Sequence, residues 1–303
     1  MNAHAMLVHH TRYRYDRPVH LGPQTIRLHP RPGCPGVLSY AMEIAPSPHS
    51  CTWDYDASGN RVARVTFARQ VTHFDITVRL VTDQTPTSPG PFAITPSARD
   101  WPARDWRPTD PALVSCMQPR DNPDDAPTPL LDALSGQWRA TLPRPTLDLL
   151  VGLTRAIATR ITYRVRPEAG VWSPEETLRN GVGSCRDTAW LLIAVLRRLG
   201  FAARFVSGYL FQPRTGASDQ TGGELHAWAQ AYVPGAGWIG LDTTSGLLAA
   251  QGHVPLAVAA IPQQAAPVSG LLDQCVATFE AVMETTTVPT DTHGMPPRRR
   301  TSL

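Results

Sequence analysis

Three residues in the C-terminal half of the chain have side chains that could act together in catalysis: Cys185, His226 and Asp242. A cysteine thiolate can attack a carbonyl carbon when a base removes the thiol proton and an acceptor orients that base. A cysteine, a histidine and an aspartate are the residue types that supply these three functions. The elements that carry them must therefore bring the three side chains together.

Cys185 lies where a glycine-rich stretch, "NGVGS", meets a long apolar segment. We expect this segment to be a helix that begins at Cys185, with Ser184 as the N-cap and Asp187 completing a short form of the capping box. Backbone N–H groups and the positive end of the helix dipole at that position favour thiolate over thiol. The same N–H groups could stabilise an oxyanion, and Gly181 and Gly183 would let a substrate backbone approach closely. The alternative interpretation is a packed core thiol, because cysteine is among the most frequently buried residue types.

His226 and Asp242 lie on two stretches with strand-like composition, "LHAWAQAYV" and "WIGLDTT", which "PGAG" joins as a hairpin. If three residues form the loop, Trp228 faces Asp242, and His226 lies on the same sheet face two positions away. A four-residue loop would put His226 and Asp242 on opposite faces unless a bulge intervened. Taken singly, His226 could be a solvated strand histidine and Asp242 a turn residue ahead of "TTSG".

The helix that follows Cys185 is the best-defined element in the sequence. Its apolar residues recur at helical spacing, and Gly200 is expected to end it. These apolar residues are Ala189, Leu192, Ile193, Leu196 and Leu199. A further strand, "ARFVSGYLF", lies between the helix and the hairpin. A helix packed on an antiparallel sheet defines an α+β fold.

The N-terminal part of the chain has a different pattern. Residues 1–83 contain alternating apolar runs separated by turn signals, of which "DASGN" is the strongest, and they predict an antiparallel β domain. Residues 84–129 are rich in proline and predict a connector rather than a core element. Helical spacing then begins near residue 130, and we expect the core domain over residues 130–260. Residues 261–303 form a C-terminal segment without an assignable element, and its end is expected to be disordered.

The composition limits the classes of function. The formal charge of +3 includes the three arginines at 298–300, so it does not indicate a nucleic-acid partner. His9, His10 and Arg12 interrupt the first apolar run, which predicts neither a secretory signal nor a membrane span and favours a cytoplasmic protein. The cysteines form no CxxC pair and the N-terminal histidines have no metal-ligand spacing, so we expect no disulfide framework, metal or cofactor. Four cysteines are interpreted as ordinary packing residues: Cys34, Cys51, Cys116 and Cys275.

Residues 171–248 resemble the bacterial transglutaminase-like superfamily, whose core is related to papain-type cysteine peptidases. The resemblance is carried by "GVGSCRDTAWLLIAVLRRLGFAARFVSGYL", by "LHAWAQAYVPGAGWIGLDTTSG" and by the order Cys, His, Asp. Residues 5–82 are similar to the β-rich N-terminal region that accompanies this core in many bacterial members. The resemblance implies Cys185 as nucleophile, His226 as general base and acid, and Asp242 as the residue that orients the imidazole.

The resemblance also implies the class of reaction. We expect acyl transfer from an amide of a protein or peptide substrate through a thioester on Cys185, ending in water or in an amine. Hydrolysis is slightly favoured, because the sequence resembles the core without the accessory domains of the animal enzymes. Trp172 lies where a residue lining the acyl site would be expected, but it could equally be an aromatic anchor before the turn "SPEETL".

Two alternatives remain open from the sequence. Zinc accepts the side chains of Cys185, His226 and Asp242, with His253 as a further candidate ligand, so a metal-dependent hydrolase is one alternative. The core could also be a non-catalytic scaffold that binds a partner through the β domain or the connector. The helix-start position of Cys185 argues against the metal, and the intact set of three residues argues against the scaffold.

Overall fold

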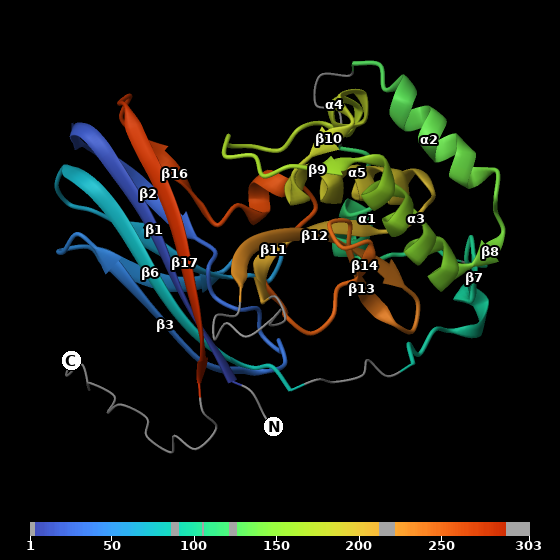
Figure 1. Cartoon of the computed structure of the whole chain (residues 1–303), viewed down its shortest axis with the longest axis horizontal. Coiled ribbons are helices and arrows are strands. Elements are labelled where there is room, and N and C mark those ends of the chain that lie inside the picture. Colours follow the sequence, from blue (N-terminus) through green and yellow to red (C-terminus); the bar gives the residue numbers. More distant parts are fainter. Residues whose placement is uncertain (1–3, 86–90, 105, 121–125, 212–221, 289–303) are drawn as a thin grey trace.

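The structure is a computed structural model of the chain, and it describes residues 4–85, 91–104, 106–120, 126–211 and 222–288. The fold is α+β. Two lobes lie side by side (Figure 1): a β lobe, built from both ends of the chain, and a core lobe, which contains the helices. No helix among the described residues is long and apolar enough to cross a membrane.

The β lobe consists of two four-stranded sheets. Its strands are β1 (His4–Val19), β2 (Leu21–Ile26), β3 (Val37–Ala45), β4 (Ser50–Tyr55), β5 (Arg61–Thr66), β6 (Val71–Asp83), β16 (Val268–Leu272) and β17 (Ala277–Val288). They are arranged in the orders β17-β1-β6-β3 and β16-β2-β5-β4, and all pairs are antiparallel. Apolar side chains of both sheets, such as Leu7 and Ile26, belong to one buried cluster. The antiparallel β domain expected from residues 1–83 is thus present.

The hairpin signal "DASGN" forms the turn between β4 and β5. One carboxylate oxygen of Asp56, Oδ1, accepts hydrogen bonds from the backbone N–H groups of Ser58 (2.9 Å) and Asn60 (3.0 Å). Gly59 has a φ of 71°, a left-handed conformation that glycine adopts without strain. Local turn chemistry therefore sets this hairpin.

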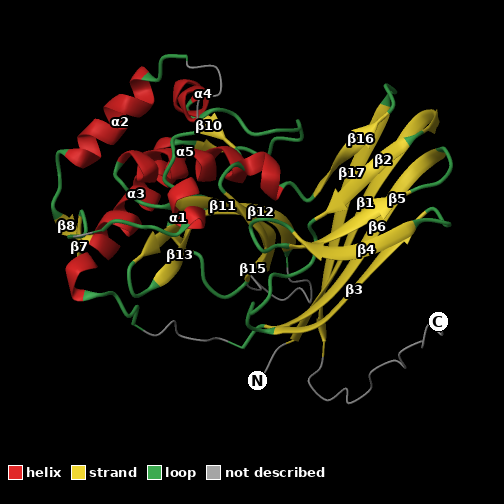
Figure 2. Cartoon of the chain, turned by 180° about the vertical axis from the view of Figure 1, so that it is seen from behind, coloured by secondary structure: helices red, strands yellow, loops and turns green. Residues whose placement is uncertain are grey.

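The core lobe is a five-stranded antiparallel sheet with helices around it (Figure 2). The sheet has the order β14-β13-β12-β11-β15, and β15 is an edge strand. Its strands are β11 (Ala203–Phe211), β12 (Gly223–Val233), β13 (Gly237–Asp242), β14 (Leu247–Leu248) and β15 (His253–Ala259). The helices are α1 (Pro111–Ser115), α2 (Pro129–Arg139), α3 (Thr146–Arg160), α4 (Pro174–Asn180) and α5 (Cys185–Arg198), with the 3-10 turns η1 (Pro96–Ala98) and η2 (Pro262–Ala265). Short strand pairs are formed by β7 (Asp100–Trp101) with β8 (Arg144–Pro145) and by β9 (Thr162–Tyr163) with β10 (Val182–Gly183).

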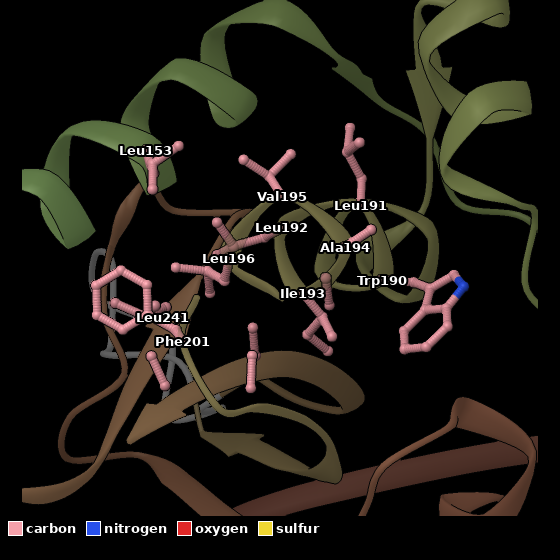
Figure 3. Packing of buried hydrophobic residues seen from close by; sticks show 14 of the residues in the cluster. Leu153, Trp190, Leu191, Leu192, Ile193, Ala194, Val195, Leu196, Phe201 and Leu241 are labelled. Atoms are coloured by element: carbon pink, nitrogen blue, oxygen red, sulfur yellow. The ribbon is translucent and has the colours of Figure 1, made fainter. Parts of the chain in front are cut away.

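Helix α5 is the central element of this lobe. It begins at Cys185 after the N-cap Ser184, as the sequence predicts, and it is followed by Gly200, whose φ is 93°. The helix is buried beyond the expected stripe, because Leu191, Ala194 and Val195 are also inaccessible to solvent (Figure 3). One face of α5 packs on β11 and β12, and α2, α3 and α4 cover other faces. A helix enclosed in this way holds its first residue in a fixed position.

The hairpin of β12 and β13 has the register on which the candidate site depends. Val233 pairs with Gly237 and Ala229 pairs with Leu241, so the loop contains three residues. Continuation of this register puts Trp228 opposite Asp242, with His226 two positions away on the same face. The register predicted from the three-residue loop is confirmed.

The proline-rich stretch over residues 84–129 is more than a connector, and this expectation is corrected. Trp101 is 1% exposed, stacks on Phe201 with ring centroids 3.6 Å apart, and donates a hydrogen bond to the backbone oxygen of Leu199 (2.8 Å). Cys116 is also buried, and its backbone oxygen accepts a hydrogen bond from the N–H of Ala203 (3.0 Å). The prolines interrupt the periodic apolar pattern from which a core element is predicted. An irregular backbone can nevertheless place a tryptophan side chain in the core.

The segment after residue 260 also differs from expectation. β16 pairs with β2, and β17 pairs with β1 along its whole length, from His4 opposite Val288 to Tyr15 opposite Ala277. The β lobe therefore includes the end of the chain as well as its beginning. Residues 289–303, whose disorder was expected, lie outside the described residues.

Candidate active site

His226 and Asp242 form a buried hydrogen-bonded pair. The Nε2 atom of His226 lies 3.1 Å from Oδ1 of Asp242, and both side chains are almost completely excluded from solvent. The other ring nitrogen, Nδ1, is buried and has no hydrogen-bond partner among the described residues. If Nε2 carries the proton given to Asp242, Nδ1 is the atom that remains for proton transfer.

Cys185 interacts electrostatically with the His226 ring. Burial alone would lower the pKa of His226, but the hydrogen bond to Asp242 and the interactions with Cys185 outweigh it and raise the pKa from 6.5 to about 10. The imidazole is then cationic at neutral pH beside a sulfur at a helix N-terminus. Cys185 itself is 9% exposed, so its thiol lies at the edge of the buried interior. This arrangement suits an imidazolium and thiolate pair.

The Asp242 carboxylate is held by four hydrogen-bond donors. Oδ1 accepts from His226 and from the backbone N–H of Thr244 (2.9 Å), whereas Oδ2 accepts from Ser245 Oγ (3.0 Å) and from His253 Nε2 (3.3 Å). Burial would raise the pKa of Asp242, but the hydrogen bonds from the two histidines hold it well below its usual range. Asp242 is therefore a fixed anion that can orient and stabilise an imidazolium.

A second buried carboxylate, that of Asp187, holds the start of α5. Its Oδ2 atom accepts hydrogen bonds from the backbone N–H (2.9 Å) and hydroxyl (2.7 Å) of Ser184, which gives the capping interaction expected from sequence. Arg166 binds the same carboxylate in bidentate fashion, with two distances of 3.1 Å. Burial would raise the pKa of Asp187, but the hydrogen bonds from Arg166 and Ser184 outweigh it and lower the pKa. Arg166 was not identified from sequence, because nothing in the linear pattern relates it to Asp187.

Trp172 belongs to this same network. Its backbone N–H donates to Asp187 Oδ1 (2.8 Å), and the Arg166 guanidinium lies 4.5 Å from the centre of its ring. The structure therefore puts Trp172, a half-buried residue, beside the start of the helix that carries Cys185. Its part in lining an acyl site stays a prediction.

Two further side chains at the site were not identified from sequence. Glu224, on β12, has a carboxylate oxygen 3.5 Å from Nδ1 of His226, and its side chain is 36% exposed. Tyr163, on β9, pairs with Gly183, two residues before Cys185. Burial together with the charges of Cys185 and Glu224 raises the pKa of Tyr163 to about 12. Only alternation along β12 could have pointed to Glu224, which lies two residues before His226 on the same face.

One group of side chains in the described part of the chain could hold a metal ion: His226, Asp242 and His253, whose ligand atoms lie within 4.8 Å of one another. Cys185 is not in this group, so the four-residue metal site considered from sequence is not assembled. In the structure these three side chains are hydrogen-bonded to one another through Asp242. The described cysteines are all free, and Cys51 is exposed, so its interpretation as a packing residue was wrong.

Comparisons with known proteins agree with this architecture. The family model for the bacterial transglutaminase-like N-terminal region matches residues 6–83, and the model for the transglutaminase-like superfamily matches residues 133–243. The uncharacterized proteins Rv2569c of Mycobacterium tuberculosis and Mb2599c of Mycobacterium bovis are each 30% identical over 260 residues, which cover 82% of this chain and 81% of theirs. The chain therefore belongs to the transglutaminase-like superfamily.

A solved structure supports the same fold. A candidate cysteine protease from Cytophaga hutchinsonii superposes with a TM-score of 0.69 and 21% sequence identity, covering 96% of this chain and 93% of that one. At this identity the likeness concerns the fold alone. The chain thus combines a papain-like, transglutaminase-like core with the N-terminal β region of the bacterial members.

Proposed function

We propose that the protein is a thiol-dependent enzyme that transfers the acyl group of an amide or peptide substrate through a thioester on Cys185. The observation that carries the proposal is the state of His226. Its Nε2 atom is bound to Asp242, its Nδ1 atom is buried without a hydrogen-bond partner among the described residues, and Cys185 helps to raise its pKa. A histidine kept only for structure would have its second ring nitrogen hydrogen-bonded, whereas Nδ1 of His226 has only a long contact of 3.5 Å with the Glu224 carboxylate.

In the first half-reaction the Cys185 thiolate attacks the carbonyl carbon and forms a carbon–sulfur bond, while the carbonyl π electrons move to oxygen. We expect the N–H groups at the start of α5 to stabilise that oxyanion. The intermediate then collapses, the carbon–nitrogen bond breaks, and the leaving amine takes the proton of the His226 imidazolium. This step leaves a thioester and a neutral imidazole.

In the second half-reaction water or an amine attacks the thioester carbonyl, and His226 removes its proton. Collapse breaks the carbon–sulfur bond, which regenerates the thiolate and imidazolium and releases an acid or a new amide. Asp242 supports both halves, because its negative charge stabilises the imidazolium and its hydrogen bond fixes the ring. We favour hydrolysis slightly over amine transfer.

The histidine and aspartate cluster makes a metal-dependent hydrolase the second candidate. Zinc accepts two histidines and a carboxylate as ligands in a catalytic site. Such an ion would have to compete with Thr244 and Ser245, which already donate to Asp242. Metal analysis of the purified protein, with and without chelator treatment, separates the two candidates.

The test compares Cys185→Ala with Cys51→Ala, a control that removes an exposed thiol instead. Hydrolysis and amine incorporation are measured on a panel of peptides and glutamine-containing proteins, with circular dichroism as the control for folding. We expect turnover to vanish in Cys185→Ala and to persist in Cys51→Ala. Retention of full turnover by Cys185→Ala would contradict thiol catalysis, and loss of turnover on chelation would favour the metal.

A further inference from the structure

The Asp242 carboxylate has two unequal sets of hydrogen-bond donors. Thr244 and Ser245 follow Asp242 in the same turn, in which the Gly246 N–H also donates to the Asp242 backbone oxygen (2.9 Å). These donors move with the turn and cannot fix it relative to the rest of the site. His226 and His253 come from other strands, and each binds a different oxygen of the carboxylate.

His253 is itself held in a defined orientation. Its Nδ1 atom lies 3.2 Å from the backbone oxygen of Ala250, and its Nε2 atom lies 3.3 Å from Asp242 Oδ2. The ring packs edge-on against Trp228, with centroids 5.1 Å apart and an interplanar angle of 78°. The side chain is 11% exposed, so little solvent competes for these contacts.

The β lobe holds the strand that begins with His253. β15 is an edge strand of the core sheet, and its backbone groups bind residues of the β lobe. There the Asn60 amide binds the Val258 backbone twice, donating to its oxygen (2.8 Å) and accepting from its N–H (2.8 Å). The Arg31 N–H donates to the Pro255 oxygen (2.9 Å). Asn60 thus replaces the neighbouring strand that β15 lacks.

We propose that His253 is a positioning residue, which clamps the Asp242 carboxylate from the side opposite His226 and which the β lobe holds in place through β15. The proposal rests on the proposed function, because it assigns a role within the same site. It gives the β lobe a part in catalysis, because the lobe holds β15, β15 carries His253, and His253 orients Asp242. Without the clamp, the carboxylate can turn away from His226, and the imidazolium and thiolate pair weakens.

Two substitutions separate the nitrogen atoms of His253. The amide nitrogen of Gln reaches the position of Nε2 and can still donate to Asp242, whereas that of Asn reaches the position of Nδ1 and can donate only to Ala250. Both remove the ring that packs on Trp228. The readout is the second-order rate of Cys185 alkylation by iodoacetamide in the full-length protein, assigned by peptide mapping, with the thermal midpoint as the control for folding.

We expect His253→Gln to react within about twofold of the native protein and His253→Asn about tenfold more slowly, which is the effect of one lost hydrogen bond to a charged group. Equal rates for Gln and Asn, whether both native-like or both reduced, would overturn the clamp, because ring packing alone predicts no difference. Slow alkylation of the native protein would overturn the clamp together with the proposed function. Turnover retained by Cys185→Ala would count against the proposed function only.

A variant far from the site tests the contribution of the β lobe. Asn60→Ala removes both bonds to Val258, and we expect alkylation of Cys185 to slow a few-fold because β15 and His253 are loosened. Asn180→Ala, at the exposed end of α4, is the matched control and should leave the rate unchanged. A native rate in a folded Asn60→Ala protein would overturn the role assigned to the β lobe.

Discussion

Replacement of Asp242 by Asn tests the electrostatic part of the account most quantitatively. The substitution keeps the shape of the side chain but removes its charge, and it offers an NH2 group where the carboxylate accepts donors on both oxygens. The NH2 group of the introduced asparagine must then face either the N–H groups of His226 and Thr244 or the donors Ser245 and His253, so one set of hydrogen bonds is lost. The rise in the pKa of His226 from 6.5 to about 10 corresponds to about 5 kcal/mol, shared between Asp242 and Cys185 against the opposing effect of burial.

If Asp242 supplies about half of that stabilisation, its loss slows thioester formation by roughly 100-fold, which corresponds to about 3 kcal/mol. The assay is kcat/KM on a substrate found with the peptide panel, supported by the alkylation rate of Cys185. Asp148→Asn, on the exposed face of α3, is the matched control. Equal rates for Asp242→Asn and Asp148→Asn in folded proteins would refute the assigned role of Asp242.

Three further outcomes follow from the structure. Trp101→Ala should lower the free energy of unfolding, measured by urea titration, by about 3–5 kcal/mol. Trp53→Ala, at a position that is 39% exposed, should lower it much less. Similar losses for the two variants would contradict the buried role of Trp101. Arg166→Met should cost about 3 kcal/mol and slow alkylation of Cys185, because Asp187 is left buried without its cation; a native-like protein would contradict this. The raised pKa of His226 stabilises the folded protein fully below about pH 6.5, and this stabilisation is lost as the pH rises through about 10. The difference in the free energy of unfolding between the native and His226→Ala proteins should therefore shrink over that range. A constant difference would contradict the raised pKa.

The parts of the site that could be predicted from sequence are those with strong local signals. The N-cap Ser184 and the apolar spacing after it define where α5 begins, so Cys185 could be assigned to the first helical position. The three-residue loop between β12 and β13 sets the hairpin register, and that register decides which face His226 and Asp242 share. Both signals depend on residues close together in the chain.

The features that escaped prediction depend on tertiary contacts. Arg166 lies 21 residues before Asp187, and no periodicity relates the two. His253 could be proposed only as a metal ligand, because its contact with Asp242 requires β15 to pair with β11. β17 is an edge strand whose side chains are mostly exposed, so it lacks the alternation of buried apolar residues that reveals an inner strand. Trp101 is buried by an irregular segment that has no period at all.

Competitive alkylation tests most directly whether Cys185 is an activated thiolate. The native protein is treated with a limiting amount of iodoacetamide near neutral pH, and the modified cysteine is identified by peptide mass mapping. Cys51 is exposed and Cys185 is only 9% exposed, so accessibility alone favours modification of Cys51. We expect Cys185 to be modified first, and we expect His226→Ala to abolish this preference. Modification of Cys51 ahead of Cys185, or an unchanged preference in His226→Ala, would contradict it.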